Sequence, residues 1–282
     1  MSTLHSTDPS TSHPPTTSRS RNKLLASLPL EDYGRLAPHL KTVPLKKRQV
    51  QHKQGQIIRE VFFLGGGVCS LIKVMEDGRT RGIAPIGNEG GLGTLVFLGE
   101  RESFGDCVVQ VPDGGAEAMP VEAFSAEMGH HGAFFDRVIR YNRALTTQMM
   151  QTIACIGFHS AQQRFCQWLL MVRDRVGRDE FPMTHESMAA ILGVRRPTVT
   201  LATRSLQQNG LIQSRRGYVT ILNRAALEAQ SCGCYAAVKT VVARLLPEGA
   251  RSRDVEPTIP TRPYEGVSRS FRMSSPSAIA RV

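Results

Sequence analysis

Arginine and threonine side chains recur between positions 195 and 204, at spacings that could bind a polyanion. A helix would place the residues at 196, 200 and 204 on one face, opposite an apolar stripe at positions 199, 202 and 206, with those at 195 and 198 at its N-terminal end. A guanidinium group can pair with O6 and N7 of guanine or with phosphate, and a threonine hydroxyl can donate or accept a hydrogen bond. The side chains in question are Arg195, Arg196, Thr198, Thr200 and Arg204.

Two short helices joined by a tight turn are predicted to position these side chains. Thr184 is a suitable N-cap for the first helix, whose apolar stripe is Met188, Ile191 and Leu192. Gly193 ends it where a left-handed residue is needed, and Pro197 lies in the first turn of the second helix, which runs over 196–209. This order is typical of a helix-turn-helix.

A short basic hairpin follows the second helix. Arg215 and Arg216 precede Gly217, and the residues from Tyr218 to Leu222 alternate as a strand does. Such a wing next to a helix-turn-helix is typical of units that place a helix in the major groove of DNA. A plain helical hairpin with a solvated basic face is the alternative, and the turn sequence together with the basic wing favours the DNA-binding interpretation.

The charge balance agrees with a nucleic-acid partner. The chain has 282 residues and a formal net charge of +11, and 41% of it is hydrophobic, enough for a sizeable core. Ten arginines and four acids lie between positions 160 and 224, the segment with the two helices. An anionic membrane surface is the other polyanionic partner, but no basic amphipathic stripe with aromatic anchors supports it.

Nothing in the sequence indicates an enzyme or export from the cytoplasm. It contains no nucleophile elbow, phosphate-binding loop or zinc-protease motif. We find no signal peptide and no apolar run long enough to span a bilayer, so we expect a cytoplasmic protein with free thiols.

The six cysteines are scattered, at positions 69, 107, 155, 166, 232 and 234. Cys69 and Cys107 fall in predicted strands and should be buried small hydrophobes. Cys232 and Cys234 could form a small metal or redox site, but one pair is weak evidence, and ordinary packing is the favoured interpretation. An iron–sulfur cluster is disfavoured, and His130 and His131 are adjacent and so would not share a helix face. We therefore predict no metal and no resident cofactor.

The pattern along the chain divides it into five segments. Short strands separated by glycine turns lie between about 43 and 127, including a predicted strand at 95–98. The predicted segments are a disordered tail (1–22), a β-roll (23–129), a long helix (130–158), a winged helix-turn-helix domain (159–240) and a disordered basic tail (241–282).

The long helix has an apolar seam close to a 3.5-residue repeat, broken at Gly157. Such a seam suits a parallel partner helix, and we predict that it forms a dimer; packing on the chain's own β-domain is the alternative. The predicted dimerisation residues are Val138, Leu145, Met149, Thr152 and Ile156.

A β-roll, a long helix and a C-terminal winged helix-turn-helix, in that order, resemble the CRP/FNR superfamily of bacterial transcription regulators. The resemblance covers about 30–240 and is strongest over 159–175 and 183–234, where Cys232-Gly233-Cys234 suggests an atypical branch. It implies an α+β fold, a homodimer and a two-fold operator. It also implies that Arg196 reads a base, while Arg215 and Arg216 in the wing contact phosphate.

Four positions depart from the cyclic-AMP-binding members of that family. Pro197 and Leu201 stand where those members have glutamate and arginine in the recognition helix, so the half-site should differ. In the effector pocket Thr94 follows Gly93 in place of the ribose-binding glutamate, and Asp106 lies in the phosphate-binding region, where it would repel the ligand. We expect weak or no binding of cyclic AMP.

The sequence therefore predicts a homodimeric regulator that binds double-stranded DNA through the helix 196–209 and does not interact with membranes. RNA polymerase and an unidentified small-molecule effector are further candidate partners. The alternative from another class is a sensor with a degenerate cyclic-nucleotide-binding-like domain that does not bind DNA.

Overall fold

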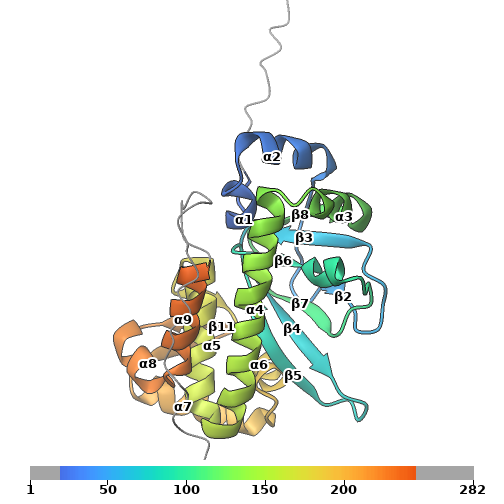
Figure 1. Ribbon diagram of the computed structural model, residues 1–282. Coiled ribbons are helices and arrows are strands. Elements are labelled where there is room, and N and C mark those ends of the chain that lie inside the picture. Colours follow the sequence, from blue (N-terminus) through green and yellow to red (C-terminus); the bar gives the residue numbers. More distant parts are fainter. Residues whose placement is uncertain (1–19, 246–282) are drawn as a thin grey trace, which may run out of the picture. The chain divides into compact units, whose positions relative to one another are not determined.

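A computed structural model describes residues 20–245 of the chain. The N-terminal part contains short helices followed by strands, and the C-terminal part is mostly helical (Figure 1). Helices α1 and α2 and a 3₁₀ turn η1 come first, at Lys23–Ala26, Leu30–Leu36 and Ala37–His39. The strands β1 to β8 are Lys41–Val43, Val50–His52, Glu60–Leu64, Val68–Val74, Thr80–Ile86, Gly91–Leu92, Asp106–Val111 and Ala116–Pro120.

These eight strands form two antiparallel four-stranded sheets, in the orders β1-β8-β3-β6 and β2-β7-β4-β5. The two sheets share one apolar core, to which Phe63 and Leu64 contribute from β3 and Val109 from β7. The β4–β5 hairpin turns at Gly78, whose positive φ of 79° is a conformation that glycine adopts without strain. The predicted α+β fold with an N-terminal antiparallel domain is confirmed.

The strand predicted over 95–98 is wrong, because the segment is the 3₁₀ helix η2 (Thr94–Leu98). Left-handed glycines bound it at both ends, Gly93 with φ 79° and Gly99 with φ 99°. The buried Thr94 hydroxyl donates to Oδ1 of Asn142, 2.9 Å away, and this bond fixes η2 against the long helix. An apolar run of four residues does not distinguish a strand from a short helix.

The long helix α4 (Ala133–Phe158) follows the short helix α3 (Val121–Gly129) and runs between the strands and the C-terminal helices (Figure 1). It passes through Gly157 without a break, contrary to the predicted interruption. It ends at His159, whose backbone is extended.

The predicted dimer seam on α4 instead faces the chain's own β-domain. Val138 is fully buried and Leu145 is 8% exposed, both in the core shared by the two sheets, and Met149 packs against that core. Thr152 and Ile156 are half-buried and line a cavity beside β5. Val138 and Leu145 are therefore occupied by the chain's own core, while a role of Met149, Thr152 and Ile156 in a dimer stays a prediction. A period of 3.5 residues marks any face that packs and does not identify its partner.

The C-terminal part is built from helices and one small sheet. Helix α5 (Ala161–Val176) begins with the predicted capping box of Ser160 and Gln163. Strand β9 (Glu180–Pro182) follows, and then come α6 (His185–Leu192), α7 (Arg196–Gln208), β10 (Ile212–Arg215), β11 (Tyr218–Ile221), α8 (Arg224–Gln230) and α9 (Cys234–Leu245). No helix among residues 20–245 is both long and apolar enough to cross a bilayer.

Two segment boundaries differ from the prediction. Asn22, placed in the N-terminal tail, is fully buried; it caps α1 and donates to the carbonyls of Leu64 and Gly90. Residues 241–245, placed in the C-terminal tail, continue α9. Residues 1–19 and 246–282 of the two predicted tails lie outside the described residues.

Gly90 is a position where a side chain would not fit. A Cβ there would overlap the ring of Tyr141, which is buried and whose hydroxyl donates to the Gly91 carbonyl at 3.0 Å. We expect Gly90→Ala to lower the free energy of unfolding by about 1–3 kcal/mol, measured by urea titration. Gly34→Ala is the control, because nothing outside its own helix backbone and its chain neighbours lies within 4 Å of the new methyl group. Equal stability of the two variants would contradict this account.

Candidate DNA-binding surface

Helices α6 and α7 form the helix-turn-helix predicted from the sequence. The Thr184 side chain caps α6 by accepting from the Ser187 amide, and Gly193 ends the helix in the left-handed conformation with φ 58°. Helix α7 starts at Arg196, with Pro197 in its first turn, where the missing N–H has no intrahelical partner to lose. Val199, Ala202 and Leu206 of α7 are buried against α5 and α6.

The opposite face of α7 is exposed. All seven residues predicted to contact DNA are exposed: Arg195, Arg196, Thr198, Thr200, Arg204, Arg215 and Arg216. Thr200 Oγ1 donates to the Arg196 carbonyl at 3.2 Å, so its hydroxyl is held against the helix but keeps a lone pair on the exposed side. Arg196, Thr198, Thr200 and Arg204 therefore lie on α7, and Arg195 is the extended residue directly before it.

The wing is the hairpin of β10 and β11, which β9 extends to a three-stranded sheet. Arg215 pairs with Tyr218, leaving Arg216 and Gly217 as a two-residue turn with φ of 49° and 81°. Positive φ at both positions is characteristic of a type I′ turn, whose twist matches that of the strands. The turn places Arg215 and Arg216 at the tip of the wing, exposed to solvent.

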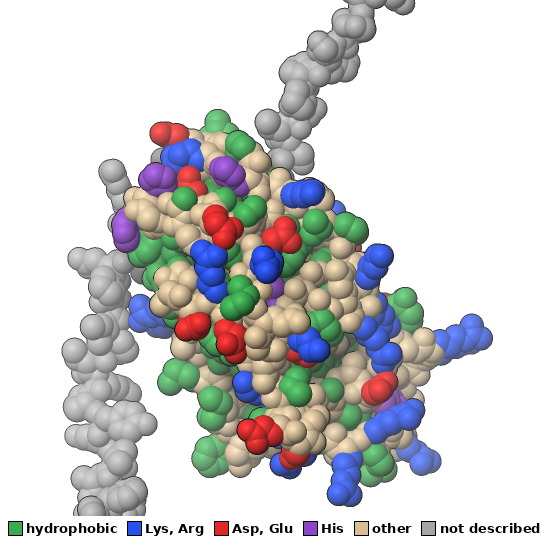
Figure 2. All heavy atoms as spheres, turned by 90° about the vertical axis from the view of Figure 1, so that its right-hand side faces the viewer, with side chains coloured by type: hydrophobic (Ala, Val, Ile, Leu, Met, Phe, Trp, Pro, Cys, Tyr) green, Lys and Arg blue, Asp and Glu red, His purple; other side chains and the backbone are tan. Residues whose placement is uncertain are grey.

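The electrostatics of this surface favour an anionic ligand. Figure 2 shows Lys and Arg side chains gathered at the lower right of the face it displays, with few acidic groups among them. Within residues 20–245, no ion pair involves the arginines of α7 and the wing, which are Arg195, Arg196, Arg204, Arg215 and Arg216. Their charges are thus available for phosphate oxygens.

Two further residues on this surface were not among the predicted DNA contacts. The ring of His185, in the first turn of α6, has its Nδ1 3.0 Å from the Thr200 hydroxyl. Partial burial and the nearby Arg196 charge lower the His185 pKa, which keeps the ring neutral at pH 7. Leu201 is 69% exposed between Thr200 and Arg204, where a side chain could meet a thymine methyl group. Their place on the surface of the motif makes them additional candidate contacts.

Polar contacts connect the β-domain to the helix-turn-helix. Arg81 of β5 and Arg164 of α5 both donate to the carbonyl of Leu192, at 2.5 and 2.9 Å. Desolvation and the Arg164 charge lower the Arg81 pKa. Arg48 forms an exposed ion pair with Glu186 at 2.7 Å.

An apolar contact accompanies them. Val68 and Ile72 of β4 and Val111 of β7 belong to the same buried cluster as Phe165 and Trp168 of α5. The β-domain and the DNA-binding domain therefore share part of one core.

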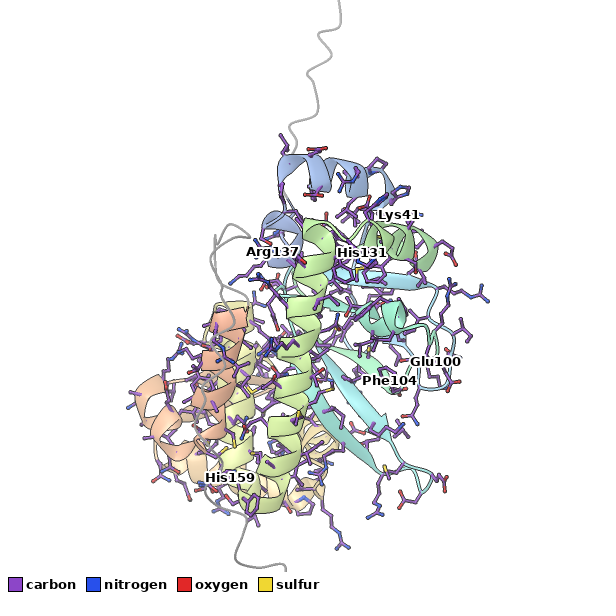
Figure 3. All side chains as sticks on the ribbon, viewed as in Figure 1. Lys41, Glu100, Phe104, His131, Arg137 and His159 are labelled. Atoms are coloured by element: carbon purple, nitrogen blue, oxygen red, sulfur yellow. The ribbon has the colours of Figure 1, made fainter. Side chains whose placement is uncertain are left out.

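The pocket that would correspond to a cyclic-nucleotide site is small and lacks cations. It measures about 40 Å³, against about 300–1,000 Å³ for typical ligand pockets. Glu100, Glu102 and Phe104 are among its lining residues, and Figure 3 shows Glu100 and Phe104 on the side of the β-domain away from the C-terminal helices. Asp106 Oδ1 accepts a hydrogen bond from the backbone N–H of Gln54 at 2.8 Å, so this carboxylate already has a partner within the protein.

The cysteines fall into two groups. Cys69, Cys107 and Cys166 are buried among apolar side chains, as predicted for the first two, and burial raises the pKa of Cys107 and Cys166 to about 12. The second group is a separate buried cluster of Cys155, Cys232 and Cys234. The sequence prediction considered the last two without Cys155, which is 77 positions away from Cys232.

Comparison with known proteins agrees with this architecture. Residues 163–230 match the Crp-like helix-turn-helix domain. A CRP-family transcriptional regulator from Thermus thermophilus is 19% identical, with 67% of this chain and 96% of that one covered and a TM-score of 0.56. FixK2 from Bradyrhizobium japonicum is 16% identical, with 68% and 98% covered and a TM-score of 0.57.

A third similar structure is the c-di-GMP-responsive global regulator CLP of Xanthomonas campestris. It is 12% identical, with 69% of this chain and 100% of that one covered and a TM-score of 0.58. At such identities the likeness concerns the fold. No curated protein matches the chain in sequence.

The matched domain covers both helices of the motif and the wing. Residues 163–230 therefore form a Crp-like helix-turn-helix domain, and the chain as a whole has the fold of solved structures of CRP/FNR-type regulators.

Proposed function

We propose that the protein is a homodimer that reads a two-fold operator through the exposed face of α7. The observation that carries this proposal is the division of α7 into a buried apolar face and an exposed face of arginine and threonine, beside a wing whose tip carries two arginines. Arg196 is assigned to base edges, together with Thr198, Thr200 and Arg204. Arg215 and Arg216 are assigned to phosphates.

The dimer interface is assigned to the exposed side of α4. Met150 is 65%, Ile153 is 70% and Phe158 is 85% exposed, and Ala154 and Gly157 are exposed beside them. These positions are spaced three or four residues apart, so they lie on one side of the helix. A stripe of large exposed apolar side chains marks an interaction surface. A second copy is the occupant that suits it, because two recognition helices about 34 Å apart would match adjacent major grooves.

Selection of genomic fragments by the purified protein at physiological salt, followed by footprinting, tests this function. The expected result is a two-fold symmetric footprint with half-sites one helical turn apart. Salt-labile binding without sequence preference, both alone and with added small molecules, would contradict it and favour a sensor that acts through protein contacts.

We further propose that the β-domain does not bind cyclic AMP in the manner of its relatives. The pocket is small and two glutamates line it, and Asp106 is hydrogen-bonded to Gln54. None of these groups offers a cation to a nucleotide phosphate. Isothermal titration of the full-length protein with cyclic AMP at millimolar concentration is expected to show no saturable heat. Binding at micromolar affinity would refute the assignment and would identify the effector.

A further inference from the structure

Four potential metal ligands meet where the C-terminal end of α4 approaches the loop between α8 and α9. They are Cys155, His159, Cys232 and Cys234, and their ligand atoms all lie within 4.8 Å of one another. Cys155 Sγ is 3.5 Å from Cys232 Sγ, and Cys234 Sγ is 3.5 Å from His159 Nδ1. Figure 3 shows His159 at the end of α4.

The two 3.5 Å separations match those of ligands around a single tetrahedral cation. Bonds of about 2.3 Å to sulfur and about 2.0–2.1 Å to nitrogen would place two sulfurs about 3.8 Å apart and a sulfur and a nitrogen about 3.5 Å apart. Three thiolates and one imidazole form one of the ligand sets of structural zinc sites. Both observed 3.5 Å contacts are therefore within a few tenths of an ångström of the tetrahedral arrangement.

The surroundings of the cluster also suit a bound cation. The three thiols are 2–4% exposed, so a metal there would be shielded from water. Gln151 Nε2 donates to Cys234 Sγ at 3.1 Å, as expected of a group that orients a metal-bound thiolate. Cys234 is the first residue of the 12-residue helix α9, so its position is fixed by that helix.

We infer that Cys155, His159, Cys232 and Cys234 bind one zinc-type divalent cation per subunit. The ligands come from two separate parts of the chain. Cys155 lies in α4, and His159 is the residue after the end of that helix. Cys232 lies in the link between α8 and α9, and Cys234 is the first residue of α9. A cation would therefore tie the helix that packs on the β-domain to the C-terminal end of the DNA-binding domain. It would fix the turn between α4 and α5 at His159.

Metal analysis of the full-length protein tests the site directly. The protein is purified without a metal-affinity tag, incubated with Zn²⁺ under reducing conditions, freed of unbound metal and assayed by mass spectrometry, with one zinc per subunit expected. Replacement by Co²⁺ should give the strong visible bands of a tetrahedral ion and near-ultraviolet thiolate charge transfer. A protein that retains no zinc, or a cobalt spectrum without thiolate bands, would overturn the inference, as would a stable Cys155–Cys232 disulfide under the same conditions.

Variants assign the ligands. Cys155→Ala and Cys232→Ala should each abolish stoichiometric zinc, whereas Cys166→Ala should retain it, because that thiol is equally buried but outside the group. His159 is only half-buried, so His159→Gln should fold; it should shift the visible cobalt bands and keep the thiolate charge transfer. Zinc retention by the two cysteine variants, or loss from the Cys166 control, would contradict the assignment. None of these readouts depends on DNA binding.

Discussion

Replacing Ile153 with glutamate is expected to convert the protein into a monomer that binds its operator poorly. Ile153 is 70% exposed at the middle of the apolar stripe on α4, so a charge there would be buried without a partner in the proposed dimer. A dimer holds its second recognition helix at high effective concentration, and losing it should weaken operator affinity by about 10²- to 10⁴-fold. Sedimentation and titration of an operator fragment measure the two effects.

The matched control is Leu98→Glu. Leu98 is 67% exposed and lies in η2, outside the stripe, so this variant should remain dimeric and bind the operator normally. Thermal unfolding of both variants checks that the fold is kept. An Ile153→Glu protein that sediments as a dimer and binds the operator with unchanged affinity would remove this face of α4 from the interface.

Replacing Arg196 with alanine is expected to remove sequence preference more than it removes affinity for DNA in general. A guanidinium that pairs with a guanine contributes about 1–3 kcal/mol of discrimination, or about 5- to 150-fold for each half-site. Non-specific binding comes mainly from the phosphate contacts of other cations and should change little. Affinities for the operator and for a scrambled fragment, measured at two salt concentrations, give both quantities.

Arg215→Ala provides the contrast. Arg215 lies at the end of β10 beside the wing turn, and its proposed partner is a phosphate, so its loss should weaken operator and scrambled DNA alike and reduce the salt dependence. The ratio of the two affinities then distinguishes the two arginines. Equal losses on both fragments for Arg196→Ala would reassign that residue to the phosphate backbone.

The DNA-binding unit was predictable because its signals are local. Thr184 and Gly193 mark the ends of α6, and Pro197 marks the first turn of α7, each through a backbone requirement that few residues meet. The burial of Val199 and Leu206 then leaves the arginines on the only other face of the helix. A short helix with two distinct faces needs no knowledge of the rest of the chain.

Which side of α4 packs on the β-domain was not predictable in the same way. Both of its sides are apolar, and the more regular seam, through Val138 and Leu145, packs on the β-domain, while the stripe through Ile153 is exposed. Periodicity locates a face that is buried, but tertiary structure decides which partner covers it. The four potential metal ligands were missed for a related reason, since Cys155 and Cys232 meet only after the chain has folded.

The core shared by the β-domain and the DNA-binding domain has a thermodynamic consequence. Val68 and Val111 are fully buried in the same cluster as Phe165, so turning the DNA-binding domain away from the sheets would expose apolar surface to water. Exposure of such surface raises the heat capacity. A switch between two arrangements of these domains would therefore have an enthalpy that changes with temperature. The free-energy difference between the two arrangements would then depend on temperature in a curved, not a linear, way.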